Sequence, residues 1–101
     1  MNNRLELHEI FCEILGSRNA YFQPPESVKM SYPAIRYSRK DIKNRFANDQ
    51  VYMQKDCYEV IVIDKDPDGE LVKKVSMFPM CSFDRHYVSD NLNHDVFTLY
   101  F

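Results

Sequence analysis

Several residue types are scarce or absent in this chain. It has no Trp, only two Gly and three Cys in 101 residues. Two glycines exclude collagen-like repeats, Gly-rich linkers and the glycine-rich loops that cradle phosphates. The cysteines are Cys12, Cys57 and Cys81, an odd number without Cys-x-x-Cys spacing, which predicts three free thiols rather than a disulfide framework.

A strong excess of one charge sign and a long apolar run are also missing. Thirteen basic against fifteen acidic residues give a net charge of −2, which disfavours nonspecific binding to nucleic acid. No apolar segment approaches the about 18 to 20 residues of a membrane span. The first residues carry charges where a signal peptide is apolar, so we expect cytoplasmic synthesis and no membrane partner.

What the chain does contain favours one folded domain over residues 1–101. Hydrophobic residues make up 45%, and seven Tyr and seven Phe supply the aromatic content. This composition is typical of a compact core and not of a disordered tail.

Two helices are predicted from the spacing of apolar residues. Residues 4–15 carry a one-sided apolar stripe that ends before Gly16, and residues 69–78 carry another that ends at Pro79. The stripe residues are Leu7, Ile10, Phe11, Ile14 and Leu15 in the first helix and Leu71, Val72, Val75 and Phe78 in the second.

Five strand-like segments surround these helices. They cover residues 18–22, 33–38, 51–64, 80–87 and 94–101, and we expect a hairpin turn over 89–93 and a long polar loop over 38–50. The order is helix, three strands, helix, two strands. It predicts an α+β fold: a mainly antiparallel sheet of about four to five strands with two helices packed on it.

Two clusters contain residue types that bind metals. Asp64, Asp66, Asp68 and Gly69 resemble the start of a calcium loop, but Val75 occupies the closing position of that motif, which favours a turn and helix cap. The second cluster predicts, as an alternative function, a small metal-dependent hydrolase or nuclease. Its residues are Asp84, His86, His94 and Asp95. The preferred interpretation has no catalytic residue, metal or cofactor.

Charge is distributed more unevenly than the total indicates. Residues 36–45 hold five basic side chains against Asp41, and residues 64–70 hold four acidic ones against Lys65. Solvated loops, or a basic loop that binds nucleic acid, would explain this pattern. Head-to-tail association between subunits would explain it too. The interface residues expected in that case are Arg36, Arg39, Lys40, Lys43 and Arg45 on one side and Asp64, Asp66, Asp68 and Glu70 on the other.

Several segments resemble one family over nearly the whole chain. These segments are Tyr21-Phe22-Gln23-Pro24-Pro25, Tyr32-Pro33-Ala34-Ile35-x-Tyr37, the strand Tyr58–Asp64 with its Asp-Pro-Asp turn, and the ending CSFDRHYVSDNLNHDVFTLYF. Together they are similar to small tail terminator, or tail completion, proteins of phages and prophages, and the DNLNHDVF segment is the most specific part.

The resemblance implies a structural role in virion assembly. Such proteins form a homo-oligomeric ring, commonly a hexamer, at the head–tail joint of a long-tailed phage. The ring ends tail-tube polymerisation and contacts both the tail-tube protein and the head–tail connector, while DNA passes through it without sequence-specific binding. The location implied is the tail or neck of the virion, assembled in the host cytoplasm. A phage-encoded inhibitor that binds a host protein is a further alternative.

Overall fold

The computed structural model describes residues 4–25, 29–47, 50–66 and 68–101, and for residues 43–47 and 50–55 it describes the backbone alone. Two helices and five strands follow one another in the predicted order. They are α1 (Arg4–Leu15), β1 (Ala20–Phe22), β2 (Ala34–Ala47), β3 (Gln50–Asp64), α2 (Glu70–Ser76), β4 (Cys81–Ser89) and β5 (Leu92–Tyr100).

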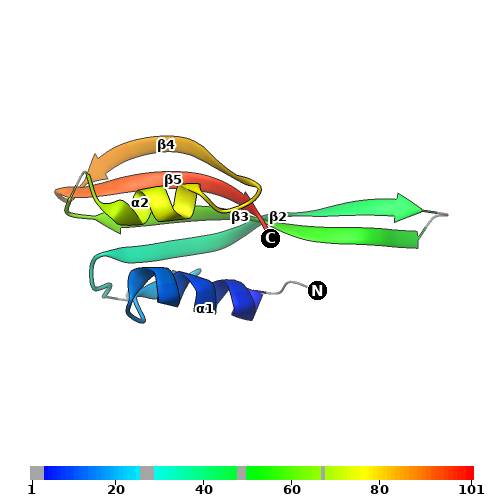
Figure 1. Ribbon diagram of the computed structural model, residues 1–101, viewed down its shortest axis with the longest axis horizontal. Helices are drawn as coiled ribbons and strands as arrows, with labels where there is room; N and C mark the ends of the chain where they lie inside the picture. Colours follow the sequence, from blue (N-terminus) through cyan, green and yellow to red (C-terminus); the bar gives the residue numbers. More distant parts are fainter. Residues whose placement is uncertain (1–3, 26–28, 48–49, 67) are drawn as a thin grey trace.

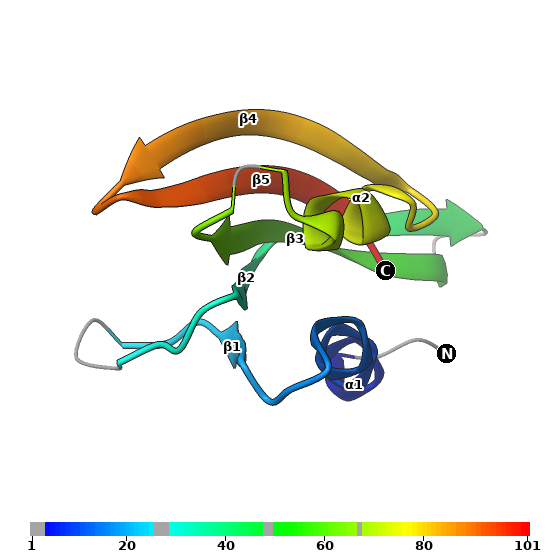
Figure 2. The same ribbon diagram turned by 60° about the vertical axis from the view of Figure 1, so that its left-hand side comes forward.

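The five strands form a single sheet in the order β1-β2-β3-β5-β4. Strand β1 pairs with β2 in parallel, and every other neighbouring pair is antiparallel. The predicted α+β fold, with two helices and a mainly antiparallel sheet, is therefore confirmed (Figures 1 and 2).

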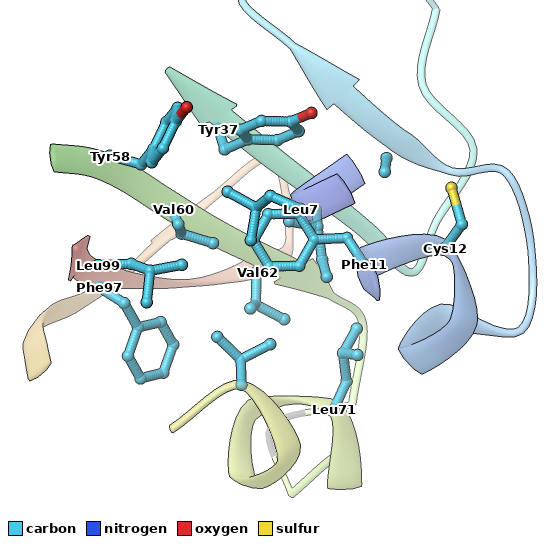
Figure 3. Close-up of a cluster of buried hydrophobic side chains, with 13 residues drawn as sticks. Leu7, Phe11, Cys12, Tyr37, Tyr58, Val60, Val62, Leu71, Phe97 and Leu99 are labelled. Atoms are coloured by element: carbon cyan, nitrogen blue, oxygen red, sulfur yellow. The ribbon is translucent and has the colours of Figure 1, made fainter. Parts of the chain in front are cut away.

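Both helices contribute to the same hydrophobic core. Leu7 and Phe11 of α1 and Leu71 and Val75 of α2 are buried in one cluster with Val60 and other apolar residues of the sheet (Figure 3). The Phe11 ring lies edge-on to Tyr37, with 5.1 Å between centroids, and stacks on Phe78 at 5.9 Å. The apolar helix stripes read from the sequence thus pack on alternate residues of the central strands.

The segment 38–50 is mostly strand, so the prediction of a long loop there was wrong. Strands β2 and β3 continue as a two-stranded hairpin, with Ile42 opposite Asp56 and Ala47 opposite Gln50. Residues 48 and 49 lie outside the described residues. On the side of Asp56 toward the hairpin turn, where β3 pairs only with β2, this ribbon projects from the rest of the sheet (Figure 1). Its sequence does not alternate between apolar and polar residues, because a projecting ribbon has no single face buried in the core.

Helix α2 and the β4–β5 turn are both shorter than the sequence predicted. Helix α2 ends at Ser76, before Pro79, because the residue preceding a proline is disfavoured in helical conformation. The β4–β5 turn contains only Asp90 and Asn91, with φ of 53° and 63°. Positive φ at both central residues is the geometry that suits the twist of a two-residue hairpin.

The three cysteines are free, and Cys12 and Cys57 are buried while Cys81 is half-buried. Burial raises the pKa of the Cys81 thiol. Among the residues that the structure describes, no helix is long and apolar enough to span a membrane.

Candidate functional site

The acidic segment and the part of the basic segment that follows Arg39 lie toward opposite ends of the long axis of the molecule. The molecule measures 51 × 25 × 23 Å, and β3 runs along it from the projecting hairpin to the acidic turn (Figure 1). At about 3.3 Å per residue, the fourteen steps of β3 from Gln50 to Asp64 span about 46 Å. This distance prevents the outer part of the projecting hairpin from contacting the acidic turn of the same molecule, residues 64–70.

The basic end is the projecting hairpin, here called the arm and defined as residues 40–47 and 50–55. Lys40 is exposed, whereas the side chains of Lys43 and Arg45 lie outside the described part of the chain. The backbone register places Lys43 opposite Lys55, and like charges in directly opposed positions destabilise a strand pair. Lys55 was not among the expected interface residues because only the register brings it beside Lys43.

Arg39, another of the expected interface residues, has an ion-pair partner within the same molecule. Its Nε donates to Asp56 Oδ2 at 3.0 Å, and its guanidinium carbon lies 6.0 Å from the centroid of the Tyr58 ring. The Tyr58 hydroxyl donates to the same Asp56 oxygen at 3.2 Å, and burial raises the Tyr58 pKa. Arg39 therefore joins the two strands at the root of the arm.

Arg36 lies outside the arm. It pairs with Ile61 in the body of the sheet and is exposed. Its neighbours Ile35 and Tyr37 belong to the core, so alternation places Arg36 on the opposite face, which carries no helix. Of the five expected basic residues, Lys40, Lys43 and Arg45 belong to the arm, and Arg36 and Arg39 do not.

The acidic end is built on a turn that is held by its own carboxylates. Asp64 Oδ1 accepts the N–H of Asp66 at 3.1 Å, and Asp66 Oδ1 accepts the N–H of Asp68 at 2.9 Å. A Cβ at Gly69 would lie 2.6 Å from Asp64 Oδ2, so a larger residue at this position would require the Asp64 carboxylate to shift. The exposed carboxylates of Asp66, Asp68 and Glu70 remain accessible to a partner.

A further carboxylate, Asp90, lies at this same end. The Asn93 side chain donates to the backbone oxygens of Asp64 and Lys65 at 3.4 and 3.3 Å, which ties the β4–β5 hairpin to the acidic turn. Asp90 is exposed in the adjoining two-residue turn. Sequence reasoning missed it because Asp90 is twenty residues or more from the acidic turn, and only the hairpin register connects them.

The structure brings two of the predicted metal-binding residues of the last hairpin, His86 and Asp95, opposite each other, but it does not gather all four. His86 lies opposite Asp95, whereas His94 lies opposite Tyr87 and stacks on its ring at 4.6 Å, so the two histidines occupy opposite faces. Asp84 accepts from Arg85 Nη1 at 2.8 Å. Within the described ranges, no three His, Cys, Asp or Glu side chains form a group that could hold a metal ion.

An apolar pocket of about 240 Å³ lies between α1, the α2–β4 connection and the end of β5. Phe101 exchanges two backbone hydrogen bonds with Asp56, which places the pocket near the root of the arm. Its size and lining suit an apolar side chain. The lining residues are Ile10, Phe78, Pro79, Met80, Leu99, Tyr100 and Phe101.

The candidate site is therefore an arrangement of two oppositely charged ends on one elongated molecule, carried mainly by the arm and the acidic turn. Comparison with family models, with curated proteins and with solved structures finds no match to this chain.

Proposed function

We propose that this protein is a structural virion assembly protein, a ring-forming tail terminator at the head–tail joint of a long-tailed phage. The observation that carries the proposal is the placement of a basic arm and an acidic turn at opposite ends of the subunit. The resemblance of residues 21–25, 32–37, 58–64 and 81–101 to tail terminator proteins supplies the biological context.

The arm supports an assembly role on energetic grounds. A two-stranded hairpin is marginally stable alone in water, and more strands or another packing surface are needed for independent stability. Within the arm, residues 40–47 and 50–55, no third strand of the described sheet pairs with β2 or β3. A neighbouring subunit or the tail tube is the surface on which the arm is ordered.

The charge arrangement selects head-to-tail contacts. Opposite charges on different ends attract between subunits, while like ends repel, so one orientation is favoured. A heterologous contact of this kind closes into a ring when the rotation between subunits permits it. A closed ring can then cap the tail tube and face the connector, with no chemical step in its mechanism.

Tube capping tests the proposed function directly. The protein is mixed with polymerising tail-tube protein of the same phage or prophage, and tube length and end density are measured by electron microscopy. We expect shorter tubes with a ring at one end. Tubes of unchanged length and bare ends would contradict the proposed function.

A further inference from the structure

In the part of the chain that the structure describes, no strand pairs with the outer edge of β4. Strand β4 is the last in the sheet, and its residues from Ser82 to Ser89 are all exposed. Phe83 and Val88 are 57% and 61% exposed. Edge strands offer unpaired N–H and C=O groups to another chain. Strand β4 contains no Lys or Pro, but the charged residues Asp84 and Arg85 and the irregular pairing between Phe83 and Arg85 interrupt its edge, so the regular part of the edge runs from Arg85 to Ser89.

The arm offers an edge of similar length. Strand β1 pairs only with residues 35–37 of β2, so no described strand lies beside the outer edge of β2 from Lys40 to Ala47. The pairing of β2 is regular from Asp41 to Arg45 and that of β4 from Arg85 to Ser89, so each edge offers a regular stretch of five residues, about 13 Å at about 3.3 Å per step. The two edges therefore match in extent.

Charge and apolar surface favour the same pairing. Strand β4 leads directly into the acidic end at Asp90, and the arm is basic. The side chain of Ile42 on the arm is exposed, and so are those of Phe83 and Val88 on β4. Cross-strand apolar pairs of this kind stabilise sheets, and an acidic end attracts the net positive charge of the arm.

We propose that the arm of one subunit pairs with β4 of the next subunit and extends its sheet. This inference rests on the proposed assembly function and names the surface that receives the arm. Each subunit donates one arm and accepts another, so the contact is heterologous and closure of the ring leaves no β4 edge free.

The test replaces two exposed side chains of the receiving edge in the full chain. Phe83→Lys with Val88→Lys should raise the concentration of half-assembly about tenfold or more, the scale of losing one well-packed interface contact. The matched control, Leu5→Lys with Met77→Lys, changes two exposed apolar residues outside β4. It should leave the concentration of half-assembly within about twofold of the unmodified protein. Equal effects from both pairs would overturn the inference.

Hydrogen exchange of the unmodified protein separates this inference from the proposed function. In the assembled state we expect the β4 amides to exchange about tenfold or more slowly than in the dilute monomer. A ring in which the exchange of the β4 amides is unchanged overturns the β4 pairing alone. This result is expected if the arm of one subunit instead enters the apolar pocket of the next. A chain that stays monomeric overturns both proposals.

Discussion

Phe11 connects the first helix to the rest of the core through two aromatic contacts. It is fully buried, lies edge-on to Tyr37 and stacks on Phe78, which lies two residues beyond the end of α2. Its position on the apolar stripe was predictable from helical spacing. Its partners were not, because Tyr37 and Phe78 are brought to it only by the folding of the sheet and of α2.

Phe11→Ala should lower the free energy of unfolding by about 3 to 5 kcal/mol, because it removes a buried ring and leaves a cavity. Urea unfolding followed by circular dichroism measures this loss. Met77→Ala, at a residue that is 82% exposed, is the control and should change stability by less than about 0.5 kcal/mol. A similar small effect for Phe11→Ala would contradict the described core.

His8 couples folding to pH. Its Nδ1 lies 2.6 Å from the Tyr37 hydroxyl, and burial, followed by the nearby Arg4 charge, lowers the pKa of His8 below 6.5. Between the lowered folded-state pKa and 6.5 the unfolded chain binds more protons than the folded chain. The contribution of His8 to stability is therefore complete above pH 6.5 and is lost as pH falls through this window.

Urea unfolding at a series of pH values measures this dependence. We expect the free energy of unfolding to decline below pH 6.5, and the part of the slope due to His8 to disappear in His8→Gln. Arg4→Gln should reduce that part of the slope, whereas Lys65→Gln, which removes a positive charge from the acidic turn, should not. An unchanged slope in His8→Gln would refute the assignment to His8.

At the scale of elements, the sequence predicts the packed segments well and the projecting ones poorly. Residues 4–15 were predicted as a helix and 51–64 as a strand, and α1 and β3 agree within one residue at each end. Both segments bury one or two faces, which imposes a clear hydrophobic period. The β2 half of the arm projects from the rest of the sheet, and its polar sequence resembled a loop, whereas residues 51–55 of the facing strand were predicted as strand.

The arm also provides the sharpest test of charge-driven association. Lys40→Glu with Lys43→Glu should weaken self-assembly about tenfold or more by replacing attraction with repulsion at the neighbour's acidic end. Sedimentation velocity over a range of protein concentrations measures the effect. Lys73→Glu with Lys74→Glu is the comparison variant: both lysines are exposed on α2 within one turn of Glu70, so the same change of charge there makes the acidic end more negative and should not weaken assembly.

Charge restoration distinguishes electrostatics from damage to the arm. Adding Asp68→Lys and Glu70→Lys to the arm variant restores opposite signs at the two ends, and assembly should recover in part. Raising salt to about 1 M should weaken the unmodified assembly, since the screening length falls to about 3 Å. Normal assembly of the arm variant at low salt would exclude the charged ends as the contact.

At the scale of the whole molecule, the charges could be located along the chain but not in space. The opposite signs of residues 36–45 and 64–70 were evident from the sequence. Their separation along β3 depends on the β2–β3 register, and the addition of Asp90 depends on the β4–β5 turn. Both are contacts between distant residues, which local patterns do not encode.

The molar mass of the protein in solution is the measurement that tests the central claim most directly. Size exclusion with light scattering, at concentrations up to those reached in assembling particles, should find a closed species. A hexamer, as the family resemblance implies, has about six times the 12.1 kDa mass of one chain. A mass of 12.1 kDa at every concentration, with no binding to tail-tube protein, would contradict the account.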